Sequence, residues 1–204
     1  MKIFKKLFLT PILLLLLTTS CVETVVVGSV AAGVVIARHK TVEETKNDTV
    51  IAAKLTKLFI ENGLKSSGGY VEFTVDEGRV LLTGVVDDLS FSRQAQDLSW
   101  KVEGVKEVID EVEARNKMKS RFSRFARGTR DYLVTGHAAT KLAFARDVSS
   151  VNYKIITVNG SLYLFGIADN EFEMKKALAI VAGISGVSRV VNHVILKNDE
   201  RRSN

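Results

Sequence analysis

Only one cysteine, Cys21, and one proline, Pro11, occur among the 204 residues. A single cysteine excludes an internal disulfide, so Cys21 must pair with another molecule, stay free or be modified. The histidines, His39, His137 and His193, share no metal-ligand spacing with one another or with a carboxylate cluster. The sequence contains no nucleophile elbow, HExxH, P-loop or Rossmann motif. These absences argue against an enzyme and against a bound metal or cofactor.

The sequence also lacks an apolar run long enough for a membrane-spanning helix. Residues 7–17 are apolar apart from Thr10 and Pro11, whereas a span needs about twenty residues. Three lysines precede this run within residues 1–6, and three small polar residues follow it at 18–20. This three-part layout predicts a cleaved secretory signal over residues 1–20.

The position of Cys21 directly after this segment resembles the lipidated cysteine of a bacterial lipobox. The pattern departs from the usual one at Thr18, where leucine is common, since Leu17 lies one residue earlier. The resemblance implies a diacylglyceryl group and an N-acyl group such as palmitate on Cys21. Val22 is not the aspartate that retains such lipoproteins in the inner membrane, which implies the outer membrane. The alternative is an incidental cysteine in a leader.

Residues 21–40 form an apolar tether after the predicted lipid. Val22–Ala37 is rich in small residues and is broken by Glu23 and Thr24. One interpretation is a segment that lies on the bilayer or packs through glycine and alanine. The other is a poorly ordered connection.

The net charge of +6 is unevenly distributed. Residues 41–114 carry 15 acidic and 8 basic residues, or −7, whereas residues 115–130 carry 7 basic residues and no acid. Residues 131–197 have 7 basic and 5 acidic residues, or +2. The basic segment 115–130 is therefore expected to be a linker or an interaction site.

The mature chain contains an internal repeat. Residues 78–112 align with residues 160–194 at a constant offset of 82 without a gap. The matched pairs include Gly78 with Gly160, Gly84 with Gly166, Ala95 with Ala177, and Val112 with Val194. The repeat predicts two small domains, at residues 41–114 and 131–198, followed by a tail over 199–204.

Each copy has the same predicted order of elements. A helix is expected after Asp48 and after Asp131, which we assign as N-caps. A β-hairpin follows, with turns at Glu77-Gly78 and Asn159-Gly160. A second helix and a last strand complete an αββαβ unit. The fold class is thus α+β, each domain being a three-stranded mixed sheet covered on one face by two helices.

Two features inside the copies lead to further expectations. Gly84 and Gly166 lie within the second strand, which indicates a bulge or a close contact with a helix. At the start of the second helix, Glu173 replaces the apolar Phe91, so this end of the helix is expected to be exposed.

The pattern G-x-V-x-L-x-G-x-V followed by V-x-G-V-x-x-V-x-x-x-V resembles the BON domain, here twice in tandem. With the lipobox, the chain is similar to dual-BON outer-membrane lipoproteins. The resemblance implies a periplasm-facing, non-enzymatic protein that binds phospholipid and supports the integrity of the cell envelope. The alternative is an assembly adaptor whose BON modules bind protein or peptidoglycan.

The basic segment and the following helix are the candidate lipid-binding site. Arg124, Arg127 and Arg130 would meet anionic headgroups, and Tyr132 and Leu133 would enter the acyl region. Nucleic acid is not an expected partner of an exported protein. The alternatives are a solvated linker, or one docked on the acidic first domain, with Tyr132 and Leu133 packed inside the protein.

Replacing Cys21 with alanine tests the lipid anchor. We expect Cys21→Ala to abolish incorporation of labelled fatty acid and to release the protein from membranes, because a diacylglyceryl group needs the cysteine thiol. Continued labelling of the variant would show that the lipobox assignment is wrong.

Overall fold

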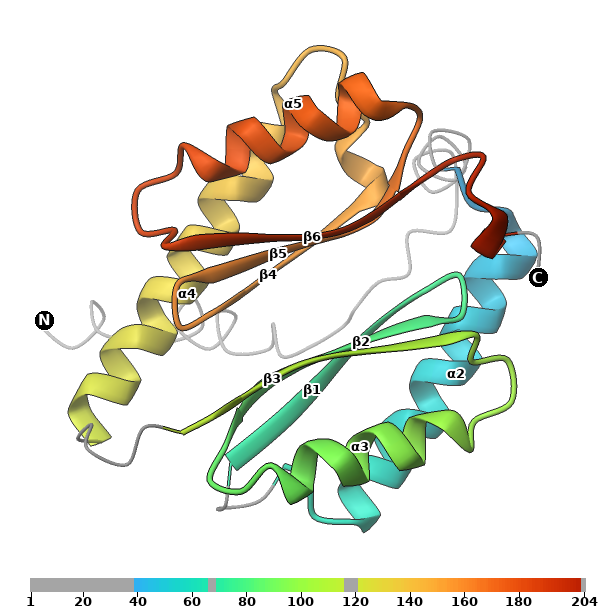
Figure 1. Cartoon of the computed structure of the whole chain (residues 1–204), viewed down its shortest axis with the longest axis vertical. Coiled ribbons are helices and arrows are strands. Elements are labelled where there is room, and N and C mark those ends of the chain that lie inside the picture. Colours follow the sequence, from blue (N-terminus) through green and yellow to red (C-terminus); the bar gives the residue numbers. More distant parts are fainter. Residues whose placement is uncertain (1–38, 66–68, 116–120, 203–204) are drawn as a thin grey trace, which may run out of the picture. The chain divides into compact units, whose positions relative to one another are not determined.

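The computed structural model describes residues 39–65, 69–115 and 121–202, and it contains two three-stranded sheets, each accompanied by helices (Figure 1). The predicted signal, Cys21 and the tether up to residue 38 lie outside the described residues. Among the described helices, none is both long and apolar enough to cross a membrane.

The first domain has the predicted αββαβ order. It consists of helix α2 (Val42–Glu61), strands β1 (Gly69–Asp76) and β2 (Arg79–Val86), helix α3 (Ser90–Trp100) and strand β3 (Glu107–Ala114). Strand β2 lies in the centre, antiparallel to β1 and parallel to β3. Both helices contact the sheet, and in Figure 1 they cover the same face of it.

The second domain repeats this arrangement. It consists of helix α4 (Arg121–Ala143), a short 3₁₀ helix η2 (Ser150–Asn152), strands β4 (Tyr153–Val158) and β5 (Ser161–Ala168), helix α5 (Glu171–Ala182), strand β6 (Arg189–Leu196) and a 3₁₀ helix η3 (Glu200–Arg202). The central β5 is antiparallel to β4 and parallel to β6. The predicted fold class, two tandem αββαβ domains with mixed sheets, is confirmed. Because α4 begins at Arg121, the expected linker is helical over residues 121–130.

Asp48 and Asp131 do not cap helices, and this prediction was wrong. Both lie inside their helices, α2 having Thr41 as its N-cap. The Asp48 carboxylate instead accepts bonds of 2.9 Å from the N–H groups of Glu77 and Gly78. These turn residues have φ of 52° and 77°, as in a two-residue type I′ hairpin. The carboxylate therefore satisfies turn N–H groups that need a partner, whereas helix-interior N–H groups are already bonded.

The same arrangement occurs in the second domain. Asp131 accepts bonds of 2.8 and 2.9 Å from the N–H groups of Asn159 and Gly160. The first helix of each copy is thus fastened to its own hairpin turn by one carboxylate. This contact explains why the two aspartates coincide in the repeat.

Each domain has its own core between the helices and one face of its sheet. In the first domain the central strand contributes Val80, Leu82 and Val86, and α2 contributes Ile51, Leu55 and Phe59. In the second domain the corresponding residues are Leu162, Leu164 and Ala168 of β5 and Val134, Ala138 and Leu142 of α4.

The other faces of the two sheets share a third apolar cluster. It contains Leu81 of β2, Val158 of β4, and Tyr163 and Phe165 of β5, all of them buried. Strands β2 and β5 are therefore covered on both faces, which fits their nearly continuous apolar sequences. The buried Arg79 lies over the Phe165 ring, 4.8 Å from its centroid, and bonds to Glu107 and to the carbonyl of His193.

The strand register adds one correspondence between the repeats, and burial corrects one expectation. Tyr153 is the counterpart of Val71, because these residues pair with Gly166 and Gly84. Glu173 is not exposed, since only 3% of its surface is accessible. Its carboxylate is buried because it accepts bonds of 2.7 Å from the N–H groups of Ser149 and Asp169.

Gly84 lies close to the backbone of strand β1, and Gly166 lies close to the backbone where the 3₁₀ helix η2 joins strand β4. Their φ angles are 138° and 135°, which side chains with a β-carbon rarely adopt. A β-carbon at Gly84 would lie 2.2 Å from the carbonyl oxygen of Tyr70, and one at Gly166 would lie 2.0 Å from that of Asn152. These positions therefore exclude any larger residue.

Valine at either glycine should lower the free energy of unfolding by at least about 3 kcal/mol, because strain and overpacking combine. Urea denaturation measures this loss, and Trp100, the only tryptophan, reports on the first domain. Gly136→Ala in α4 is the control, since a β-carbon there meets nothing within 4 Å, and it should stabilise the helix by about 1 kcal/mol. An unchanged midpoint for Gly84→Val would contradict this account.

Candidate functional site

The outward face of α4 carries the apolar residues that the sequence predicted as lipid-binding. Tyr132 is 80% exposed and Leu133 is 64% exposed. They point away from the core because Val134, Ala138 and Leu142, spaced four apart, form the buried side of the helix. Neither residue packs inside the protein, so the alternative of buried side chains is wrong.

Phe144 adds to this face and was missed in the sequence. It directly follows α4 and is 85% exposed. Its distance of 11 residues from Leu133 is three helical turns, so the two positions share one side of the helix. The helical spacing, continued by one more turn, would have identified it. We call Tyr132, Leu133 and Phe144 the α4 apolar face.

The charged residues of α4 itself are basic, with the exception of Asp131. Arg130 is exposed, and its guanidinium passes over Gly186. Arg124 and Arg127 lie within α4, but their side chains are outside the described part. The single acid of α4, Asp131, is turned toward the hairpin N–H groups. An anionic surface would therefore meet cations and apolar side chains here.

An open groove adjoins the α4 apolar face. It has a volume of about 550 Å³ and lies between α4 and α5. Its lining residues are His137, Thr140, Lys141, Phe144, Ala179, Ile180 and Gly183. The lining combines apolar side chains with the basic Lys141, as the α4 apolar face combines apolar side chains with Arg130.

At the matched positions of the first domain, the two aromatic residues of this face are replaced by polar ones. The buried positions Ile51 and Val134 correspond at an offset of 83, and the same offset places Thr49 at Tyr132, Val50 at Leu133 and Glu61 at Phe144. The most exposed aromatic residue of the three is thus replaced by a carboxylate. The α4 apolar face is a property of the second domain alone.

A second site, which is polar, lies around His39 and Lys40, the first residues that the structure describes. The His39 N–H donates to Asn152 Oδ1 at 3.0 Å. Lys40 forms ion pairs with Asp48 and, at 2.8 Å, with Asp76. Burial acts to lower the pKa of Lys40, but the carboxylates outweigh it and hold the pKa above its usual value. The two residues therefore contact both domains.

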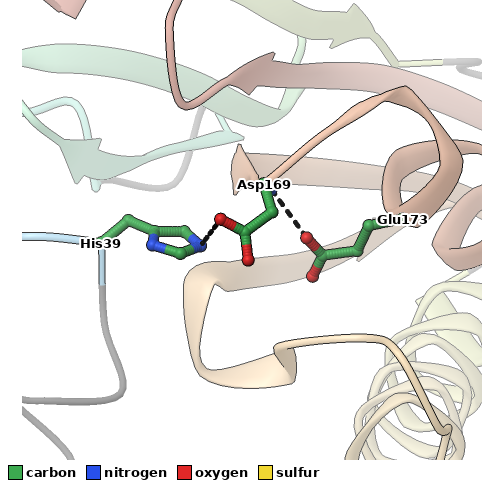
Figure 2. A group of neighbouring side chains, drawn as sticks. All are labelled: His39, Asp169 and Glu173. Atoms are coloured by element: carbon green, nitrogen blue, oxygen red, sulfur yellow. Dashed lines mark hydrogen bonds and ion pairs between the residues drawn. The ribbon is translucent and has the colours of Figure 1, made fainter.

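His39 also lies beside two carboxylates that are distant in sequence. Figure 2 shows its ring next to Asp169, with Glu173 on the other side of Asp169. The separation of His39 Nε2 from Asp169 Oδ1 is 3.2 Å. Near them, burial raises the pKa of Tyr153, and the charges of Glu173 and Asp169 raise it further. No local spacing in the sequence could have indicated this group.

The 3₁₀ helix η3 closes over the same region. Arg202 donates to both carboxylate oxygens of Glu77, at 2.8 and 2.9 Å, and to the carbonyl of His39 at 2.9 Å. Its hydrogen bonds with Glu77 raise the pKa of Arg202 although partial burial opposes this. The neighbouring Arg201 bonds Asp199 and lowers the pKa of that carboxyl to about 2. Arg202 thus joins the second domain to the hairpin turn of the first.

These features define a class of protein built from two small αββαβ modules with a fastened hairpin in each. The BON domain family matches residues 47–116 and 133–198, and the chain belongs to this family, with two BON domains in tandem.

Several known proteins resemble the chain over much of its length. An uncharacterised protein of Anaplasma centrale is 33% identical over 76% of this chain and 99% of its own. The outer membrane lipoprotein DolP of Haemophilus influenzae is 28% identical over 84% of this chain and 86% of its own. A 21 kDa hemolysin of Actinobacillus pleuropneumoniae is 30% identical over 57% and 59%, respectively.

The contact of Arg202 with Glu77 yields a stability prediction. Arg202→Ala leaves a carboxylate that is 4% exposed without its cation, and should lower the free energy of unfolding by about 2 kcal/mol. The control is Arg201→Ala, since Arg201 is half exposed and exposed pairs contribute less than about 1 kcal/mol. Equal urea midpoints for the two variants would contradict the assigned role of Arg202.

Proposed function

We propose that this protein is a lipid-anchored component of the cell envelope whose second BON domain binds anionic phospholipid and thereby supports outer-membrane integrity. The observation that carries the proposal is the α4 apolar face, exposed beside cations and absent from the first domain. The Haemophilus relative is an outer membrane lipoprotein, and this supports the proposed location and the predicted lipid on Cys21. In this proposal the protein faces the periplasm and is not an enzyme.

The composition of the face suits the boundary between headgroups and acyl chains. Phe144 and Leu133 can enter the acyl region, and Tyr132 can keep its hydroxyl in the headgroup layer. Full burial of such a side chain is worth about 1.5–3 kcal/mol, and each nearby cation adds about 1 kcal/mol at an anionic surface. Together these few side chains and cations would give only a weak contact between the isolated second domain and a membrane.

The predicted lipid anchor makes a weak contact sufficient. Anchoring holds the domain near the bilayer, so the second contact forms at a high effective concentration. The predicted group on Cys21 carries more than one acyl chain, which is sufficient for stable attachment. The α4 face would therefore add a contact of the second domain with the bilayer, and attachment itself would not depend on it.

The adaptor function is supported by a different observation. The first domain is acidic and exposes Trp100 at 55% and Ile60 at 63%. An anionic membrane would repel this domain, so these residues are better suited to a protein partner. The adaptor function predicts binding that does not depend on lipid charge.

Flotation with vesicles tests the lipid proposal, using residues 38–204 so that neither the lipid on Cys21 nor the apolar stretch Val22–Ala37 contributes. We expect binding to vesicles that contain phosphatidylglycerol and little binding to purely zwitterionic vesicles. Leu133→Glu should weaken it roughly tenfold or more, because an apolar contact is lost and a like charge is introduced. Val50→Glu is the matched control, since it is the same position in the first domain. Undiminished binding of Leu133→Glu would sink the proposal and favour the adaptor function.

A further inference from the structure

His39, Asp169 and Glu173 form a group with the side chains of a divalent metal site. One ligand atom from each lies within 4.8 Å of the others. Imidazole nitrogen together with carboxylate oxygen is a donor set that zinc accepts. The residues come from three places in the fold: the segment after the tether, the end of β5 and the first turn of α5.

The contact between His39 and Asp169 fits shared coordination better than a hydrogen bond. His39 Nε2 is buried and lacks a hydrogen-bond partner of normal geometry among the described residues, although it lies 3.2 Å from Asp169 Oδ1. Two ligands at about 2.1 Å from one zinc ion, at a tetrahedral angle, are separated by roughly 3.4 Å. The pair therefore has the spacing of neighbouring ligands.

Unsatisfied polar atoms gather around this group. Within the described part of the chain, the buried atoms His39 Nε2 and Asn152 Nδ2 lack a hydrogen-bond partner. Tyr153 is 92% buried, its exposed fraction being 8%, and the charge and hydrogen bonding of Glu173 beside its hydroxyl raise its pKa beyond the effect of burial. Buried polar groups without partners are rare and call for a ligand, an ion or water.

The carboxylate of Glu173 is already oriented for such a role. Each of its oxygens accepts one backbone N–H, from Ser149 and from Asp169, at 2.7 Å. Each oxygen keeps a second lone pair for a cation. Hydrogen bonds that fix a ligand in this way are typical of the surroundings of metal sites. Lys197 Nζ also lies 3.4 Å from Asp169 Oδ1, and its side chain is 56% exposed and can move into solvent.

We propose that His39, Asp169 and Glu173 bind one zinc ion, with the Tyr153 hydroxyl as an outer partner. The ion would connect the residue that follows the tether to the turn between β5 and α5. It would thereby fix the point at which the anchored segment leaves the second domain. This inference is independent of lipid binding by α4.

Zinc titration of the full lipidated chain in detergent micelles, purified without a polyhistidine tag, tests the site. Isothermal titration calorimetry should show one zinc ion per chain. His39→Ala and Asp169→Asn should weaken binding at least tenfold, and Tyr153→Phe about tenfold, as is typical for an outer partner. The matched control is His137→Ala, because His137 is exposed on α4 and should leave the affinity unchanged.

A second measurement identifies the imidazole directly. With histidine-selective ¹⁵N labelling, zinc should shift the ring resonances of His39 and leave those of His137 and His193 unchanged. Circular dichroism shows whether each variant is folded, and His39→Ala removes no core side chain. Absence of saturable zinc binding in the unaltered chain, or unchanged binding by folded His39→Ala, would overturn the proposal. Neither result depends on vesicle binding.

Discussion

The burial of β2 and β5 on both faces is the constraint on which the rest of the structure depends. Residues that alternate along β2 and β5 face the helices of their own domain, and those between them join the cluster of Leu81, Val158, Tyr163 and Phe165. Because the other face of each sheet is occupied by this cluster, the helices of each domain pack on one face of the sheet only. Consequently α4 has one side against its own sheet and α5, and the α4 apolar face lies on the side that is exposed to solvent.

The two repeats differ at the outward sides of their first helices, which do not pack on the sheet. The strands keep an offset of 82, and the first helices correspond at 83, so the connection between helix and sheet differs by one residue. Asp48 and Asp131 still reach the N–H groups of their turns despite the difference. The outward sides of the helices are free of such contacts, and there Glu61 stands where Phe144 stands in the other copy. Function can therefore differ between the domains without a change of fold.

Much of the fold could be predicted from the sequence, because the repeat and the hairpin signals are local. The paired turns at Glu77-Gly78 and Asn159-Gly160 fixed the order of the strands, and the exposure of Tyr132 and Leu133 followed from helical spacing. Asp48 and Asp131 were misassigned because an aspartate before an apolar helical pattern has two possible partners, its own helix or a distant turn. Only the tertiary structure distinguishes these possibilities.

The sites that sequence reasoning missed depend on residues far apart in the chain. Glu173 looked exposed because its apolar counterpart was replaced by a charge, yet two backbone N–H groups make its burial favourable. The group of His39, Asp169 and Glu173 has no common spacing, since a segment before the first domain meets a turn of the second.

That same meeting point links the anchor to the lipid-binding proposal in physical terms. His39 and Lys40 are held by contacts to both domains, and Arg202 closes over the His39 carbonyl. In the proposed function, holding residues 39 and 40 would reduce the orientations that the second domain can take relative to the chain before it. Less entropy would then be lost when the α4 apolar face meets a membrane.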